Sequence, residues 1–297
     1  MSAEELRLLI EQMRGGPLDF EADPAAIRET FDGMLATFPV EEGITFQDVS
    51  LGGVPTVQST EPGADLGRTL LYFHGGAYVA GSPTGYRALW SRVASAAGVR
   101  GVAPAYRLAP EHPFPAAVDD AVAAYRALLE EGVEPGGLAV AGDSAGGGLA
   151  MALLLAARDQ GLPLPSSLTL LSPWVDLTCT GASMETRAAA DPSLTPAGLR
   201  QRAGDYLAGQ DAGHPLASPL RADLRGLPPM LIHVGTAEVL LDDAIRLAAR
   251  GAECDVRASL EIWPSLVHVF AAFSFALGEG REAISHCGSF IRSHFSK

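Results

Sequence analysis

Short apolar runs alternate with longer amphipathic stretches along most of the chain. The strand-like runs lie at 45–50, 54–59, 69–74, 99–106, 138–143, 167–172, 229–235 and 255–263, and the main helical stretches between them at 84–97, 115–131, 146–160 and 242–251. Strands that alternate with helices predict an α/β fold with a mostly parallel sheet and helices on both faces. In such a sheet, binding groups gather beyond the carboxyl ends of the strands.

Two regions depart from this alternation. Residues 3–14 and 24–38 have apolar positions at helical spacing with charged residues between them, so each predicts an amphipathic helix that needs a surface to cover. The gap at 175–228 predicts one or two further helices, with Thr195 as an N-cap and Pro196 at the first helical position. We expect both regions to lie over the carboxyl edge of the sheet.

The chain is therefore expected to form a single domain, 1–297, made of a core and a helical cap. The cap would comprise residues from about 1–42 and about 178–215, and the core residues from about 43–177 and 216–297. A hairpin is expected at the start of the core, around the glycines of 51–53.

Composition narrows the possible partners. Hydrophobic residues make up 47% and charged residues 19% of the 297 residues, which is typical of a folded globular protein. The formal net charge of −14 argues against nucleic-acid binding and against anionic membrane surfaces, because both need a basic face. Lys297 is the only lysine, which excludes Schiff-base chemistry, a P-loop and a Ser-x-x-Lys pair.

The cysteines and the N-terminal stretch indicate a compartment. Cys179, Cys254 and Cys287 are far apart and have no C-x-x-C spacing, so neither a disulfide framework nor a zinc site is implied, and a reducing cytoplasm is expected. The N-terminal stretch lacks the basic region and apolar core of a signal peptide. No run approaches the roughly 18 apolar residues of a membrane span.

Residues 142–146 read GDSAG and fit the pattern G-x-S-x-G. A strand precedes them and a helical stretch follows, so Ser144 is predicted on the sharp strand-to-helix turn that exposes a nucleophilic serine. Phosphate-binding loops fit less well, because Ser144 takes the second glycine position of G-x-G-x-x-G and Gly148 stands where a Walker loop has lysine. A plain glycine-rich turn remains the alternative unless Ser144 has partners.

A nucleophilic serine needs a base, and the base needs an acid that orients it. His268 follows the strand at 255–263 by a short loop, which places it at the carboxyl edge of the sheet. Glu238 lies on the loop that leaves the strand at 229–235 and is expected to be the acid. Asp242 is the alternative, although an acidic residue in the first turn of a helix is explained by the helix dipole.

The remaining histidines after Ser144 have ordinary explanations. His233 lies within an apolar strand and is expected in the core, His286 and His294 lie in the final helix, and His214 lies in the predicted insertion.

The strand at 69–74 ends in a glycine pair that could stabilise negative charge. Gly75 and Gly76 allow the backbone to come close to a developing oxyanion, and together with the N–H of Ala145 they are expected to form an oxyanion hole. A plain Gly-Gly turn is the alternative.

These residues and the stretches around them resemble a known family. The stretches, in chain order, are HGGAY (74–78), YRLAPEHPFPAA (106–117), GDSAGG (142–147), SPW (172–174), VGTAEVLLDDA (234–244) and HVF (268–270). Over residues 70–270 the chain resembles the hormone-sensitive-lipase-like family of α/β-hydrolases, and more narrowly the bacterial esterases of its GDSAG branch. The resemblance implies an α/β-hydrolase fold with a mostly parallel eight-stranded sheet, flanking helices and a helical cap.

The resemblance also implies a carboxylesterase that needs no metal and no organic cofactor, acts on a small ester of short to medium acyl chain, and could form a homodimer. The implied roles are nucleophile for Ser144, base for His268, acid for Glu238, oxyanion donors for Gly75, Gly76 and Ala145, and candidate pocket residues for Tyr78, Trp174 and Val239. Amide, carbamate or lactone hydrolysis by the same residues is one alternative. A non-catalytic receptor for small ligands on an esterase scaffold is another, although a receptor would not need His268.

The chain departs from the family pattern at three positions. Ala77 replaces the usual third glycine, Glu238 stands where aspartate is more frequent, and Ala105 replaces a frequent aspartate. Arg107 and Glu111 are expected to hold a proline-rich loop in place rather than to act in the chemistry.

Overall fold

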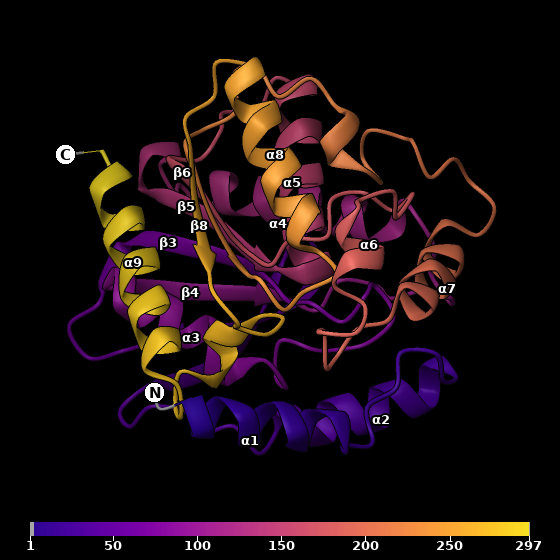
Figure 1. The fold of residues 1–297 in the computed structure, drawn as a ribbon. Coiled ribbons are helices and arrows are strands. Elements are labelled where there is room, and N and C mark those ends of the chain that lie inside the picture. Colours follow the sequence, from indigo (N-terminus) through magenta and orange to yellow (C-terminus); the bar gives the residue numbers. More distant parts are fainter. Residues whose placement is uncertain (1–2, 297) are drawn as a thin grey trace.

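The structure is a computed structural model that describes residues 3–296, and a twisted sheet runs through its centre (Figure 1). Within these residues the sheet has eight strands in the order β1-β2-β4-β3-β5-β6-β7-β8. The strands are Thr45–Leu51 (β1), Val54–Thr60 (β2), Asp65–Phe73 (β3), Val99–Pro104 (β4), Leu138–Asp143 (β5), Ser167–Leu171 (β6), Met230–Gly235 (β7) and Ala258–Trp263 (β8). β1 and β2 pair antiparallel to their neighbours, and β3 to β8 are parallel. The predicted mostly parallel sheet is confirmed.

Helices cover both faces of the sheet. α3 and α9 pack together on one face, and α4, α5 and α8 lie on the other (Figure 1). The helices are Ala3–Arg14 (α1), Pro24–Leu35 (α2), Arg87–Ala97 (α3), Ala116–Glu130 (α4), Ser144–Asp159 (α5), Ser183–Thr186 (α6), Pro196–Leu207 (α7), Leu241–Glu253 (α8) and Gly278–His294 (α9), with 3-10 turns at Pro135–Gly137, Pro219–Arg221 and Phe270–Phe273. No helix in this part of the chain is long and apolar enough to cross a membrane.

The central strands are mostly apolar in sequence and fully buried. Every residue of β5, β6 and β7 is buried, because helices pack on both faces. β8, at the edge of the sheet, is only partly buried. β8 is also shorter than the predicted strand at 255–263, because the N–H of Val256 still closes the end of α8 by donating to Gly251.

Local turn chemistry agrees with the predicted boundaries at two places. Gly52 and Gly53 have φ of 59° and 85° between β1 and β2, which is the left-handed backbone that a two-residue hairpin requires. Thr195 caps α7 by accepting the N–H of Gly198 at 2.9 Å, and Pro196 is the first residue of that helix.

The loop between α1 and α2 contacts the segment that contains α6 and α7. The Thr195 hydroxyl donates to Glu21 at 2.6 Å, and Arg202 of α7 donates to the carbonyl of Ala22 at 2.9 Å. α2 also packs on the loop after β3, where the Phe31 and Tyr86 rings lie 5.8 Å apart. The two stretches assigned to the cap are therefore joined to each other, and α2 rests beside the carboxyl edge of the sheet.

Candidate active site

Ser144 lies on the turn between β5 and α5. It has a φ of 51°, which is a strained backbone for a residue other than glycine, and it opens α5. The turn is tight enough to require glycine beside it. A Cβ on Gly142 would come 2.3 Å from the carbonyl oxygen of Gly146, and one on Gly146 would come 2.1 Å from that of Phe73. This packing fixes the serine at the positive end of α5, above the sheet.

Three side chains from three separate segments form one line of hydrogen bonds. The Ser144 Oγ lies 2.9 Å from Nε2 of His268, and Nδ1 of His268 lies 2.8 Å from Oε2 of Glu238. Because Nδ1 faces a carboxylate, it carries the imidazole proton, and Nε2 is left to accept the proton of the serine hydroxyl. His268 is the partner that the G-x-S-x-G motif needed, and this arrangement can make the serine nucleophilic.

Glu238 is completely buried and well supplied with donors. Its Oε1 accepts the N–H of Gly235 at 2.6 Å and the hydroxyl of Ser172 at 2.8 Å. Ser172 in turn accepts the N–H of Val269, the residue after His268, at 3.1 Å. Burial raises the pKa of Glu238, and its hydrogen bonds to His268, Gly235 and Ser172 oppose that rise.

The electrostatics of His268 follow from this partner. Burial lowers its pKa, but the hydrogen bond and the negative charge of Glu238 outweigh burial, so the pKa lies above its ordinary value. The carboxylate therefore stabilises the imidazolium that forms when His268 takes a proton.

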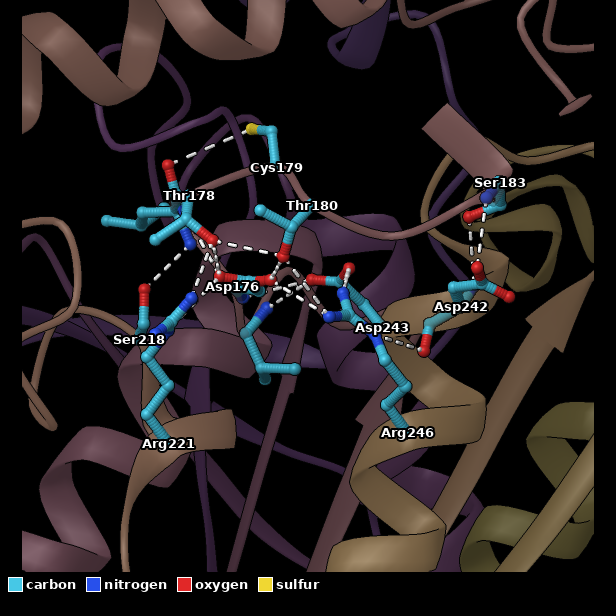
Figure 2. Close-up of polar contacts among 12 residues, drawn as sticks. Asp176, Thr178, Cys179, Thr180, Ser183, Ser218, Arg221, Asp242, Asp243 and Arg246 are labelled. Carbon is cyan, nitrogen blue, oxygen red and sulfur yellow. Dashed lines mark hydrogen bonds and ion pairs between the residues drawn. The ribbon is translucent and has the colours of Figure 1, made fainter. Parts of the chain in front are cut away.

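Asp242, the alternative acid, is engaged elsewhere. Its carboxylate accepts the N–H of Ser183 at 3.0 Å, and its own N–H donates to the Ser183 hydroxyl at 3.0 Å (Figure 2). This exchange ties α8 to α6, so the structure does not bring Asp242 to His268.

A buried polar network next to Asp242 was not anticipated from the sequence (Figure 2). Asp243 accepts the N–H groups of Val175 and Asp176 at 2.9 and 3.0 Å. Arg246 forms ion pairs with the carboxylates of Asp176 and Asp243 at 3.0 and 3.1 Å. Burial raises the pKa of Asp243 to about 7. The network joins the start of α8 to the segment after β6. Glu238 comes just before α8 and Ser172 just after β6, so the network holds together the two segments that carry them. Asp176 lies in the segment after β6 and Asp243 in the first turn of α8, and this position between a strand and the next helix is the sequence signal that could have marked them.

The loop after β3 places the expected oxyanion donors differently from the prediction. The N–H of Gly75 donates to Oδ1 of Asp143 at 3.1 Å and is therefore engaged. The N–H groups of Gly76 and Ala77 have no hydrogen-bond partner within residues 3–296. Ala145 stands in the first turn of α5, where backbone N–H groups have no partner within the helix.

Asp143, the variable residue of the G-x-S-x-G motif, was also missed. It is completely buried, accepts the Tyr72 hydroxyl at 2.9 Å in addition to Gly75, and has its pKa raised to about 7 by burial. The partners of Asp143 come from β3 and from the loop after it, far away in the sequence, so the motif alone does not reveal them.

The candidate pocket residues Tyr78, Trp174 and Val239 are all buried. Tyr78 stacks on Tyr206 of α7 with ring centroids 3.9 Å apart. The N–H of Trp174 donates to the carbonyl of Ser144 at 2.9 Å. The N–H of Val239 donates to Asp191 at 2.9 Å.

The other histidines and the proline-rich loop have structural contacts. His233 is buried and accepts the Trp263 indole N–H at 3.0 Å, His286 pairs with Glu261 at 2.9 Å, and the ring of His214 lies 5.1 Å from that of Phe114. In the loop, Arg107 pairs with Asp120 and Glu111 pairs with Arg28 of α2.

Known proteins share both this sequence and this fold. The model of the α/β-hydrolase-fold family matches residues 70–272. An acetyl-hydrolase of Streptomyces hygroscopicus is 50% identical over 251 residues, 84% of each chain, and an esterase of Acinetobacter venetianus is 33% identical over 278 residues, 93% of this chain and 91% of that one. The crystal structure of EstE5 soaked in ethyl alcohol matches with a TM-score of 0.95 at 44% identity, and that of an esterase from the bacterial hormone-sensitive lipase family with 0.96 at 42%, each over 100% of both chains. The chain thus belongs to the α/β-hydrolases and, within them, to the hormone-sensitive-lipase-like family.

Proposed function

We propose that this hydrolase is a carboxylesterase that works through a Ser144–His268–Glu238 triad and an acyl-enzyme intermediate. The observation that carries the proposal is the line of hydrogen bonds from Ser144 through His268 to the buried carboxylate, at 2.9 and 2.8 Å. The names of the similar proteins, acetyl-hydrolase and esterase, support the same class of reaction.

In the first step, the Ser144 oxygen attacks the ester carbonyl while Nε2 of His268 takes the hydroxyl proton. The imidazolium is stabilised by Glu238. The carbonyl carbon becomes tetrahedral, and its oxygen takes the negative charge. His268 then gives its proton to the departing alcohol, and the acyl group stays on the serine as an ester.

The oxyanion donors that we propose are the N–H groups of Gly76, Ala77 and Ala145. Gly75 was expected among them, but its N–H is held by Asp143, so the next residue along the loop takes its place. Ala77 keeps a backbone N–H although it replaces a glycine. Donors of this kind act because they already point to where the charge develops.

In the second step, water attacks the acyl-enzyme while His268 removes one of its protons. The oxyanion of this second tetrahedral intermediate is stabilised by the same amides. Its collapse breaks the bond to the Ser144 oxygen, which takes the proton back from His268 as the carboxylic acid is released. The steps use only this chain and water.

We also propose a small ester of short to medium acyl chain as the substrate. The acetyl-hydrolase name of the Streptomyces relative supports it. Amide, carbamate or lactone hydrolysis remains the second candidate, and matched ester and amide substrates distinguish it from esterase activity. The three buried free thiols, Cys179, Cys254 and Cys287, support the predicted reducing cytoplasm. A homodimer remains a prediction that light scattering can check.

The test compares the purified chain with its Ser144→Ala variant in the hydrolysis of p-nitrophenyl butyrate. We expect kcat to fall by about 10⁴-fold or more, because removal of a triad member leaves only binding and oxyanion stabilisation. Ser293→Ala, which removes the hydroxyl of an exposed serine on α9, serves as the matched control. Retention of most of the activity by Ser144→Ala would falsify the mechanism.

A further inference from the structure

Arg28, on the cap helix α2, reaches the loop that follows β3. Its Nε donates to the carbonyl of Val79 at 2.7 Å, and its Nη2 donates to the carbonyl of Ala109 at 2.8 Å. Its two terminal nitrogens also form a pair of bonds with the Glu111 carboxylate, at 2.8 and 2.6 Å. One side chain of the cap therefore binds two core segments that are about thirty residues apart.

Both carbonyls help to hold the oxyanion loop, which comprises residues 75–80. Val79 lies two residues after Ala77, one of the proposed donors. Ala109 donates its own N–H to the carbonyl of Tyr78 at 2.9 Å. Arg28 thus binds the loop directly at Val79. It also binds Ala109, which in turn donates to Tyr78 of the loop.

The loop is one that needs external support. Ala77 and Tyr78 have φ of 54° and 64°, so two successive residues with side chains adopt the left-handed backbone that glycine prefers. Gly76, before them, has a φ of 111°. A backbone in such a conformation persists only where its surroundings hold it, and a small shift would misdirect the Gly76 and Ala77 N–H groups.

Arginine is suited to this position because its guanidinium is flat and its donors diverge. The bond pair with Glu111 fixes the plane of the guanidinium, and this aims Nε at Val79 while Nη2 reaches Ala109. Glu111 itself is half exposed, and its side chain bonds to Arg28 rather than to any of the three proposed oxyanion donors. A lysine could reach one of the two carbonyls at a time but has no such fork.

We propose that Arg28 is a positioning residue, through which the cap holds the oxyanion loop in its active conformation. The inference rests on the proposed esterase function. It gives the N-terminal helices a part in the chemical step in addition to covering the site.

The experiment compares Arg28→Ala with Arg7→Ala in the full-length chain. Arg7 is an exposed arginine of α1 whose ion-pair partners among the described residues are Glu4 and Glu11 of the same helix, so it controls for loss of one positive charge from the N-terminal helices. For Arg28→Ala we expect kcat for p-nitrophenyl butyrate to fall by about 10- to 100-fold with little change in KM, since misplacement of transition-state donors affects the chemical step. Arg7→Ala should keep the wild-type values.

Two further readouts separate positioning from a general loss of structure. The affinity for a boronic acid, which forms a tetrahedral adduct with the serine, should weaken in parallel with kcat in Arg28→Ala. Guanidinium chloride at about 20 mM, far below denaturing concentrations, should restore part of the activity of Arg28→Ala, while equal sodium chloride should not. Glu111→Gln, which leaves both carbonyl contacts possible, should lose less activity than Arg28→Ala.

A rise in KM alone, or equal losses in Arg28→Ala and Arg7→Ala, would overturn the proposal. So would unchanged boronic-acid affinity, or a failure of guanidinium to rescue. If the wild-type chain hydrolysed no ester, the esterase proposal would fail separately, and amide hydrogen exchange would still test Arg28. The amide hydrogens of residues 75–80 should exchange faster in Arg28→Ala than in Arg7→Ala. Equal exchange rates would contradict the proposal that Arg28 holds this loop.

Discussion

Ser172 links the two sides of the proposed triad. Its hydroxyl donates to Oε1 of Glu238 at 2.8 Å and accepts the N–H of Val269, next to His268, at 3.1 Å. One buried hydroxyl therefore orients the Glu238 carboxylate and holds the loop that carries His268 and Val269.

The Ser172→Ala variant should lose part of both functions. We expect kcat to fall by about tenfold, because Glu238 and His268 lose alignment, and the free energy of unfolding to fall by about 1–3 kcal/mol, because the buried N–H of Val269 is left unpaired. Steady-state kinetics and urea denaturation measure the two effects. Wild-type values of kcat and stability would show that the bridge is dispensable.

Substitution of Glu238 should reduce activity far more than substitution of Asp242, the alternative acid. Glu238→Gln should lower kcat by about 10⁴-fold, because the neutral amide neither fixes the tautomer nor stabilises the imidazolium. Asp242→Asn should keep kcat within a few-fold, since Asp242 binds Ser183, and should lower stability by about 1 kcal/mol. The same assay on both variants, checked by circular dichroism, decides between them. The reverse order of losses would move the acid to Asp242.

The raised pKa of His268 sets the acid limb of the pH profile. Only neutral imidazole accepts the serine proton, so kcat/KM should fall as the pH drops through the pKa of His268. Because Glu238 holds that pKa above its ordinary value of 6.5, the limb should lie above that pH. In the residual activity of Glu238→Gln the limb should move to lower pH, since the charge that raises the pKa is gone. A profile of kcat/KM in buffers of constant ionic strength checks both, and a limb that does not move would contradict the pairing.

Two substitutions in the oxyanion loop should differ sharply. A Cβ on Gly75 would lie 2.4 Å from Oδ2 of Asp143 and 3.1 Å from Cβ of Ser144, so Gly75→Ala should displace the nucleophile and reduce kcat by about 100-fold or more. Ala77→Gly keeps its N–H and relieves a left-handed alanine, so kcat should stay within a few-fold. Thermal melting curves verify that both variants fold. Equal activity in the two variants would contradict the assigned geometry.

These cases also mark how far a single sequence can lead. Ser144, its turn and the parallel sheet could be predicted, because G-x-S-x-G and the apolar runs are local patterns whose structure follows from chain geometry. Glu238 and His268 could be named because strand ends meet at one edge of the sheet. The engagement of Gly75 could not be foreseen, because Asp143 lies 68 positions away in the chain.

The contacts of Arg28 could not be predicted from the sequence either, for a related reason. The spacing of apolar residues predicts a helix at 24–38 and the side it buries, but a polar residue on such a helix is usually solvated. Only the folded chain places Val79 and Ala109 within reach of its guanidinium. Long-range polar contacts therefore account for most of what the sequence alone did not predict.

The close approach of α5 to β3 has a practical consequence for protein engineering. Because a Cβ on Gly146 would collide with the carbonyl oxygen of Phe73, the helix that carries the nucleophile has no freedom to shift or to accept bulk near its start. Libraries that aim to change ester preference or stereochemistry should therefore leave residues 142–148 untouched. Sequence variation is better placed in the cap, on the exposed positions of α1 and α7, where side chains can change without moving the reacting oxygen.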